Sequence, residues 1–368
     1  MTTHEPVPRL QLSGPGDVAQ LVPYLLGFVP QDSLVLLVTR GGRVEVTARA
    51  DLTDVQPTGQ AEHLIDRIWG RFPDADAFLV AYTDSPEQGW GILRRCTEHL
   101  PAAADSQSML ISADTWHGED GTSGPVDRTG SIAAQAVYAG MSVSRSRADL
   151  EATFTSPDHS QELDKALSAA AARLPATTDT AKIVARTRSL LGQYLAAANS
   201  VEDRPAVIRM PVEDAAQLAM LGRSSAGRDT ALLSITRANA ERHFEMWRAV
   251  VNRVPDSYAE AAAYLAGMAA WVTGDGASAN VALNRSLRIA ERAGAEPLAG
   301  LLDGLIDHVV PPTAWEQVRA QALTLTHPEV RHAIRGTHAP DWERVTPPPA
   351  RPTLQRPGEA PPAPGIGI

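Results

Sequence analysis

Two short runs of consecutive apolar residues limit most tightly what the first half of this chain can fold into. They span residues 34–38 and 77–82, and polar or glycine-containing segments bound each of them. A strand with apolar residues on both faces has to be covered on both sides, so each run predicts a central strand of a sheet that carries helices. Residues 44–52 instead alternate apolar and polar side chains after the turn at 40–42, which predicts a half-exposed strand in a hairpin with the first run.

Helical patterns separate and follow these strands. Apolar residues recur at helical spacing over 61–72. Ser85, Pro86 and Gln88 predict the start of a further helix that is closed by a capping box. A third strand is expected at 109–113, with another helix after it. This order of elements predicts an α/β domain with a mixed sheet and packed helices.

An additional helix is expected before the first strand. Residues 18–26 place apolar side chains on one helical face, with Asp17 as the expected N-cap and Gly27 as a left-handed C-cap. Pro23 lies within this pattern. Because proline lacks a backbone N–H, we expect it to kink or shorten the helix.

The second half of the sequence shows helical patterns throughout. The breaks at Pro255, Gly274, Gly294 and Pro311 are short, which predicts helices that pack antiparallel to their neighbours. Residues 267–287 alternate small and large side chains in the manner of a tetratricopeptide helix pair, with Gly274 in the turn. One such unit is convincing and its neighbours are weaker, so we describe this half as tetratricopeptide-like.

These patterns predict three parts. Residues 1–155 are expected to form an α/β domain, and residues 156–335 an antiparallel, all-α, tetratricopeptide-like domain. Residues 336–368 are expected to form a disordered tail, because nine prolines from Pro340 onward leave too little apolar surface to fold.

Composition narrows the classes of partner. The formal net charge of −10 and the pI near 5.5 argue against a nucleic-acid partner. A single cysteine, Cys96, excludes an internal disulfide and a cysteine-rich metal site. No apolar run is long enough to span a membrane, and the N-terminus has no apolar signal core. We therefore expect a soluble, cytoplasmic protein with no membrane partner.

Three stretches of the sequence carry a resemblance to a known family. They are residues 22–35 with 48–52, residues 136–140 with 146–150, and residues 270–277. They resemble the actinobacterial family catalogued as domain of unknown function 4192. The activity of that family is unknown, so the resemblance implies a placement and little chemistry. The family-motif residues of the first stretch are Pro23, Gly27, Phe28, Pro30, Asp32 and Ser33.

Asp32 and Ser33 admit two interpretations. The two residues either present a carboxylate and a hydroxyl to a ligand or form a turn before the strand. A separate point concerns the loop after Trp116, where the sequence departs from the family pattern. In the loop, the resemblance implies clustered cysteines soon after the position of Trp116, whereas residues 117–121 contain none. A metal or redox role for this loop therefore has no support.

Two groups of residues are candidates for ligand binding. Arg49 and Asp51 lie two apart on a strand, so they project from one face and either line a pocket or form an ion pair. The second group follows the ends of two central strands, where ligands of open α/β sheets bind. This group contains Asp84, Asp114, Trp116 and His117. The glycine-rich segment 118–130 is either a lid over this group or an insertion.

No motif points to a cofactor or to a resident metal. Residues 13–16 are glycine-rich but lack the Gly-Lys-Ser/Thr ending of a phosphate loop. His327, His332 and His338 are not spaced to share a helical face. We expect these histidines to be exposed rather than metal-bound.

The function expected from these observations is non-catalytic. A scaffold, interaction or sensing protein would use its helical half to bind a protein partner, and no recognisable catalytic motif contradicts this. The alternative is a small-molecule or nucleotide-binding α/β domain, including a hydrolase, with its site at the ends of the strands.

Overall fold

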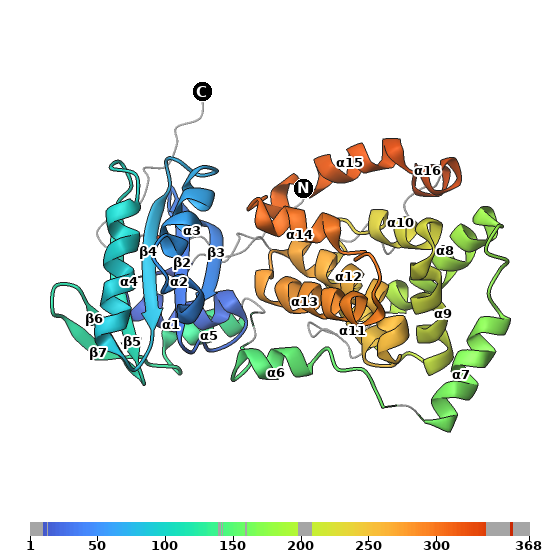
Figure 1. The fold of residues 1–368 in the computed structure, drawn as a ribbon, viewed down its shortest axis with the longest axis horizontal. Coiled ribbons are helices and arrows are strands. Elements are labelled where there is room, and N and C mark those ends of the chain that lie inside the picture. The colour runs from blue at the N-terminus through green and yellow to red at the C-terminus, as the bar shows by residue number, and fades with distance from the viewer. Residues whose placement is uncertain are drawn as a thin grey trace, which may run out of the picture. The chain divides into compact units, whose positions relative to one another are not determined.

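The computed structural model describes residues 10–12, 14–138, 141, 143–158, 160–197, 208–335 and 354–355. The chain divides into an α/β unit that runs to Arg147 and a helical unit that begins at Ala148 (Figure 1). The predicted boundary at residue 155 lies shortly inside the second unit. Of the predicted tail, only Leu354 and Gln355 are described: they form β8, which belongs to the α/β unit and pairs in parallel with β1 (Leu10–Gln11).

A six-stranded sheet in the order β3-β2-β4-β5-β6-β7 forms the centre of the α/β unit. Neighbouring strands β4 and β5 are parallel, and the other neighbouring pairs are antiparallel. The predicted mixed sheet is therefore confirmed. The strands are β2 (Ser33–Arg40), β3 (Arg43–Asp51), β4 (Asp76–Tyr82), β5 (Ser106–Ser112), β6 (Thr115–Gly118) and β7 (Ser123–Pro125).

Burial along these strands follows the sequence pattern. β2 and β4 are buried over nearly their whole length, whereas every residue of β3 is at least partly exposed. The difference arises because β2 and β4 have strands on both sides, while β3 lies at an edge of the six-stranded sheet. The two apolar runs are thus the central strands that the sequence predicts.

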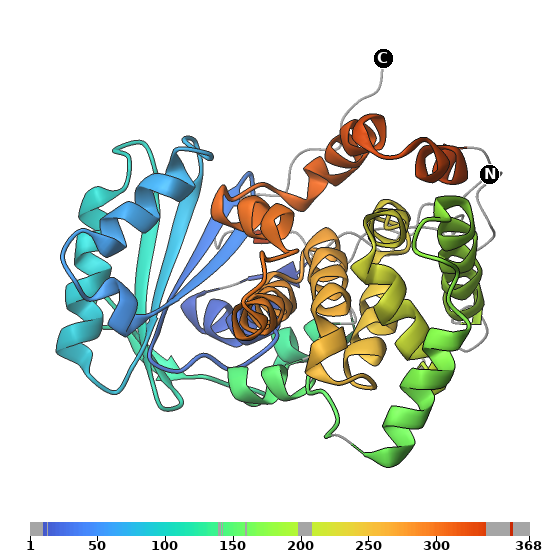
Figure 2. The same cartoon turned by 45° about the vertical axis from the view of Figure 1, so that its right-hand side comes forward.

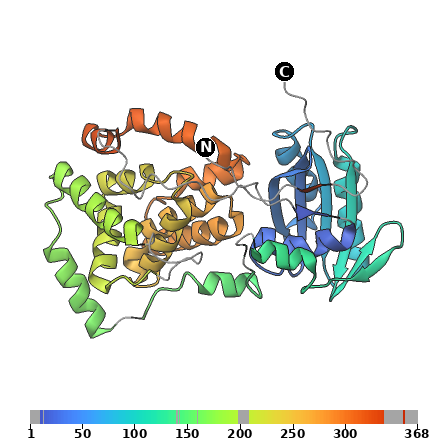
Figure 3. The same cartoon turned by 180° about the vertical axis from the view of Figure 1, so that it is seen from behind.

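Helices cover both faces of the sheet. α4 (Pro86–His99) packs on one face, where Gly89 lies against Ala81 and Leu110. α1 (Pro15–Leu26) packs on the other face, where Gly16 lies against the Trp116 ring. α3 (Gln60–Trp69) packs against α4, and the short helix α2 (Leu52–Val55) packs against α3. α5 (Ser131–Tyr138) packs against α1. Figure 3 shows the face that carries α1 and α5.

The first helix differs from its prediction in two details. Its N-cap is Gly14 rather than Asp17, which lies in the first turn. The helix also continues past Pro23 to Leu26, so the proline does not shorten it. Burial of the residues that follow the proline offsets the roughly 3 kcal/mol that an internal proline costs. The left-handed cap at Gly27 is confirmed by its φ of 73°.

Part of the glycine-rich segment 118–130, for which the sequence leaves a lid or an insertion open, forms regular structure. β6 and β7 form a hairpin that extends the sheet. The Gly118 N–H donates to the carbonyl of Thr122 (2.8 Å), and the Asp120 carboxylate accepts hydrogen bonds from the Thr122 N–H and hydroxyl. The first part of the proposed lid is therefore a tight turn and a strand.

The helical unit is built around α12 (Asp256–Thr273), which is buried along most of its length. Figure 2 shows the unit from a second direction. Around α12 lie α9 (Val212–Arg223), α10 (Ser225–Leu233), α11 (Ala240–Val251), α13 (Gly276–Ala293) and α14 (Gly300–Asp307). The other helices are α6 (Arg147–Ala152), α7 (Gln161–Ala172), α8 (Thr180–Ala197), the 3-10 helix η1 (Pro312–Ala314), α15 (Trp315–Leu325) and α16 (Pro328–Arg335).

The α12–α13 pair has the close packing that the sequence predicts. A Cβ atom at Gly267 of α12 would lie 3.3 Å from the Ala279 carbonyl oxygen and the Ala282 Cβ of α13, and 2.6 Å from Leu302 Cδ2 of α14, so a side chain does not fit there without a shift. Gly274 ends α12 with a φ of 85°, and the Asp275 side chain caps α13 by accepting from the Ser278 N–H (3.0 Å). The turn and the small residues are therefore where the sequence places them, while the tetratricopeptide likeness stays a prediction.

Candidate functional site

The predicted candidates gather at the end of the sheet where β3, β4 and β5 finish. Register places five residues opposite one another in turn across β3, β2, β4, β5 and β6: Asp51, Ser33, Tyr82, Ile111 and Trp116. Residues that lie opposite each other in a ladder share a face of the sheet. We call these five residues the edge row.

Arg49 forms hydrogen bonds with Ser33 and Asp51, the two residues at one end of the edge row. Its Nε donates to Ser33 Oγ (2.9 Å), and its Nη2 donates to Asp51 Oδ1. The guanidinium carbon lies 6.0 Å from the centre of the Phe28 ring. Only 12% of the Arg49 side chain is exposed. The guanidinium therefore ties β2, β3 and the segment before β2 together.

The family-motif residues shape the same corner of the unit. Gly27 ends α1, and Phe28 forms an isolated bridge with Ser144. The Val29 N–H donates to the Ser144 carbonyl, and the Ser144 N–H donates to the Gly27 carbonyl. Pro30 is buried beside them. The motif fixes the path of the chain from α1 to the start of β2.

Asp32 acts through its backbone and Ser33 through its hydroxyl. Asp32 has a positive φ of 41°, and its carbonyl accepts from the Leu52 N–H (2.8 Å). Ser33 Oγ donates to the carbonyl of Gln31 (2.6 Å) while it accepts from Arg49. These contacts are those of a turn that leads into a strand, the second of the two interpretations above.

Asp84 and Asp114 lie just beyond the ends of β4 and β5 and are exposed. The Ser112 hydroxyl donates to Asp84 Oδ1 (2.9 Å). The Arg128 guanidinium donates twice to Asp114 Oδ1, from Nε (3.1 Å) and from Nη2 (2.9 Å). Each carboxylate is thus held by a neighbouring segment at the same end of the sheet as the edge row.

Trp116 and His117 point to opposite faces of β6, because side chains alternate along a strand. The Trp116 ring packs between Gly16 and Gly124, where a Cβ atom would come within 3.1 Å of the indole. His117 lies opposite Leu110, on the face that α4 covers. The structure therefore does not bring His117 to the edge row, and it separates His117 from Trp116, with which the sequence analysis grouped it.

Sequence reasoning overlooked Tyr82, which lies at the centre of the edge row. Tyr82 is 7% exposed, and its buried hydroxyl makes no hydrogen bond with the described residues. Burial raises the pKa of Tyr82 above its usual range, and the charge of nearby Arg128 acts in the opposite direction. The available signal was a hydroxyl-bearing aromatic residue at the end of an otherwise apolar run.

A cleft of about 510 Å³ opens at the same end of the sheet, on the face that α4 covers, between Gln56 and α4. Ser85 and Pro86 begin α4 as predicted, but the Ser85 side chain makes no capping bond. Gln88 does not close a capping box: its Nε2 donates to Gln56 Oε1 (3.3 Å). We call this cavity the α4 cleft.

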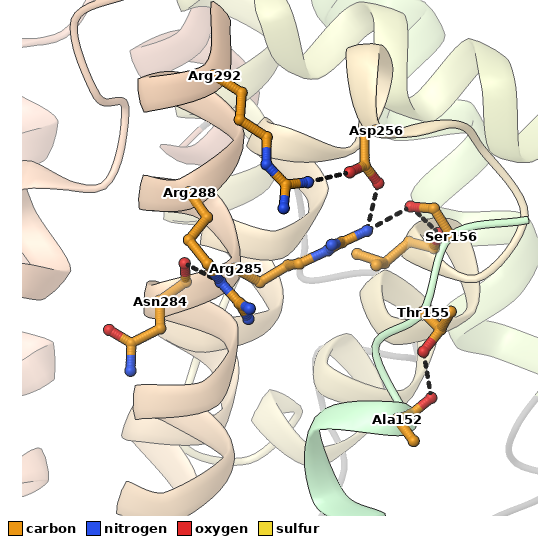
Figure 4. Close-up of polar contacts among 9 residues, drawn as sticks. Ala152, Thr155, Ser156, Asp256, Asn284, Arg285, Arg288 and Arg292 are labelled. Atoms are coloured by element: carbon orange, nitrogen blue, oxygen red, sulfur yellow. Dashed lines mark hydrogen bonds and ion pairs between the residues drawn. The ribbon is translucent and has the colours of Figure 1, made fainter. Parts of the chain in front are cut away.

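A basic cluster lies on α13 in the helical unit. Arg285, Arg288 and Arg292 share one helical face, since they are three and four residues apart. Arg285 Nη2 donates to Asp256 Oδ1 and to Ser156 Oγ (3.0 Å), and Arg292 Nη1 donates to Asp256 Oδ2 (3.3 Å) (Figure 4). Arg288 Nε donates to a carbonyl of its own helix. Among the described side chains, no carboxylate pairs with Arg288. We call these arginines the α13 basic cluster.

The described ranges contain no group of His, Cys, Asp and Glu side chains that could hold a metal ion. No helix in them is long and apolar enough to cross a membrane. Of the predicted exposed histidines, His338 lies outside the described residues, and His327 Nδ1 accepts from the Glu329 N–H (3.2 Å).

Comparison with known families places the chain. The family model described as Domain of unknown function (DUF4192) matches residues 15–313. The chain belongs to this family. The matched part of this DUF4192 chain contains the edge row, the α4 cleft and the α13 basic cluster. No curated protein and no solved structure gives a significant match.

Proposed function

We propose that this DUF4192 protein is a non-catalytic interaction protein whose helical unit binds an acidic segment of a protein partner. The observation that supports the proposal is the α13 basic cluster, in which Arg285 and Arg292 share the carboxylate of Asp256. Arg288 adds a third positive charge on the same face. Guanidinium groups bind carboxylates through paired, charge-assisted hydrogen bonds, so an acidic segment is the partner that this face fits.

The three arginines differ in how exposed their side chains are, and this difference suggests different roles. Only 15% of the Arg285 side chain is exposed, and its bonds to Asp256 and Ser156 hold it in place. The Arg292 side chain is 67% exposed, and Arg288 is also exposed. Arg288 and Arg292 are therefore the residues that would contact a partner, while Arg285 positions the cluster.

The charge of the whole chain makes this face selective. The formal net charge is −10, so most of the surface repels an acidic segment. A local excess of arginine attracts such a segment to one place, which gives specificity and a faster encounter more than raw affinity.

The proposal carries three finer expectations. The helical unit resembles a tetratricopeptide array, for which the close α12–α13 packing at Gly267 is the supporting observation. The protein acts in the cytoplasm, and its host is an actinobacterium. The alternative function, small-molecule or nucleotide binding by the α/β unit, also stays a proposal.

The test measures binding of a fluorescein-labelled oligoglutamate peptide to the full chain by fluorescence anisotropy. The matched variants are Arg288→Glu with Arg292→Glu, and Arg237→Glu as an exposed control outside the cluster. We expect saturable binding that weakens with salt. The double reversal should weaken it by about tenfold or more, and Arg237→Glu should not.

Two outcomes would contradict the proposal. One is that the wild-type chain does not bind the peptide at low salt. The other is that the double reversal and the Arg237→Glu control bind equally well, because the peptide then contacts some other part of the surface. Circular dichroism of each variant verifies that the helical unit is folded.

A further inference from the structure

The α4 cleft is lined along one side by a regular stripe of α4. Glu87, Gly91 and Arg95 are each four residues apart, so they follow one another along one helical face. Ile92 is buried at the base of the cleft, and Gln56 faces α4 from beyond the end of α2. The cleft is shallow and open to solvent, and its volume is about 510 Å³.

Opposite charges stand at the two ends of this stripe. Glu87 and Arg95 are eight residues apart, which corresponds to about 12 Å along a helix. No cation pairs with Glu87 among the residues that the structure describes, and Glu87 is exposed. The cleft therefore presents an acceptor of positive charge at one end and a donor of hydrogen bonds to an anion at the other.

Arg95 is held in place but keeps free donor capacity. Its Nη2 donates to the carbonyls of Val55 (2.9 Å) and Gln56 (3.1 Å), which satisfies the end of α2. Its Nη1 forms an ion pair with Glu62 Oε1 at 3.9 Å, a separation that leaves the Nη1 hydrogens without a hydrogen bond to that carboxylate. A guanidinium has five N–H donors, so a ligand carboxylate still finds donors on a side chain whose position is fixed.

We infer that the α4 cleft binds a short linear zwitterion with the length and charge spacing of a tripeptide with free ends. Three extended residues span about 10 Å, which is comparable to the rise of about 12 Å between Glu87 and Arg95 along α4. The ligand ammonium faces Glu87, and the ligand carboxylate faces Arg95. The amides of Gln56 and Gln88 join across the cleft at 3.3 Å, a long bond that peptide groups of the ligand replace.

Gly91 leaves the middle of the stripe open for this ligand. A Cβ atom at Gly91 would meet nothing within 4 Å, whereas a Cβ atom at Gly89 would lie 2.6 Å from Leu110 Cδ1. A larger side chain at residue 91 therefore fills the cleft without disturbing the packing of α4 on the sheet. Gly304 of α14 also has nothing within 4 Å of its Cβ position and serves as a matched control in the helical unit.

The experiment is isothermal titration calorimetry of the full chain with trialanine, compared with N-acetyl-trialanine amide, which lacks both end charges. We expect saturable binding of trialanine and none of the capped peptide. Gly91→Leu should abolish binding, and Glu87→Gln should weaken it by about tenfold because one charged contact is lost. Gly304→Leu should bind as the wild type does.

Three results would overturn the inference: no saturable heat with trialanine, equal binding of the capped peptide, or unchanged binding by Gly91→Leu. Because a leucine has a higher helix propensity than a glycine, Gly91→Leu should stay folded, and thermal unfolding confirms this. This inference is independent of the proposed partner binding. Charge reversal on α13 should leave trialanine binding unchanged, so the two proposals fail separately.

Discussion

In the α/β unit the buried polar side chains among the described residues are Ser33, Thr39 and Thr83, whereas the helical unit buries nine, including Asn239 and His243. The carboxylates of Asp84 and Asp114, which follow the ends of two central strands, are exposed. The two units thus place side-chain polarity differently: one at an edge that solvent reaches, the other inside its core.

The difference arises because helices and strands differ in how many of their backbone groups lack a hydrogen-bond partner at their ends. Strands pair across the sheet, but a helix leaves its last carbonyls without partners. α10 ends inside the helical unit, and the carbonyls of residues 233–235 accept hydrogen bonds from Arg319 (2.6 Å), Asn239 (3.0 Å) and Trp315 (2.9 Å). A unit in which helices end within the core needs buried polar side chains, and a sheet does not.

The largest expected effect tests how rigid each interior is. A Cβ atom at Gly227 of α10 would lie 2.2 Å from the carbonyl oxygen of Leu221, a backbone atom that cannot rotate away. We expect Gly227→Ala to lower the free energy of unfolding of the helical unit by about 3 kcal/mol or more. Gly89→Ala in the α/β unit meets side-chain atoms rather than backbone, with methyl groups of Leu110 and Thr83 nearest at 2.6 Å and 2.9 Å, so it should cost about 1–2 kcal/mol.

Hydrogen exchange, followed by mass spectrometry, assigns each loss of stability to its unit. Gly304→Ala has open space at its Cβ position and should raise helix stability by about 0.5–1 kcal/mol. Equal losses at Gly227 and Gly89 would show that the tight turn between α9 and α10 adapts as easily as side chains do.

The pH dependence of stability should also separate the units. Burial lowers the pKa of His243 from 6.5 to about 3, and the Arg319 charge acts in the same direction against a hydrogen bond with the Ser234 backbone. Below pH 6.5 the unfolded chain binds a proton that the folded chain does not. Stability is therefore complete above this pH and falls by up to about 1.4 kcal/mol per pH unit on acidification.

His243→Leu removes this titration and keeps a buried apolar side chain at that position of α11. Urea unfolding of both proteins at a series of pH values measures the difference. We expect the wild-type chain to lose more stability than the variant between pH 6.5 and the range in which carboxylates titrate. Parallel profiles would mean that the His243 pKa is not lowered in the folded state.

Much of the fold could be predicted because burial acts locally along the chain. Residues 34–38 and 77–82 are apolar on both faces, and they became central strands. β7 could not be predicted, because it contains Gly124 and Pro125, residue types that are depleted in strands. Gly124 occurs there for a tertiary reason: the Trp116 ring lies within 3.1 Å of where its Cβ would be.

The candidate site could be predicted only in part for a related reason. Asp84 and Asp114 follow strand ends, and that local pattern places them correctly at one end of the sheet. The α4 cleft depends on Arg95 reaching the carbonyl of Val55, forty positions earlier in the chain. No spacing within α4 encodes that contact, so the cleft emerges only when α2 and α4 are placed together.

A third comparison concerns two arginines at the same end of the sheet. Arg49→Met removes a hydrogen bond to the buried Ser33 hydroxyl and an ion pair from a side chain that is only 12% exposed. We expect it to cost about 1.5–3 kcal/mol. Arg128→Met breaks a pair with Asp114 in which the side chains are 48% and 75% exposed, and it should cost less than about 1 kcal/mol.

Urea unfolding of both variants measures which of the two arginines contributes more to the free energy of unfolding of the α/β unit. If Arg49 costs clearly more than Arg128, then the family-motif corner stabilises the α/β unit through one of its few enclosed polar groups. Equal costs would instead mean that solvent screens the whole edge. Arg49 would then stabilise its unit no more than an exposed ion pair does. The polar contacts of the edge row would therefore be weaker than the buried polar contacts of the helical unit, and they would also lie in a different kind of place.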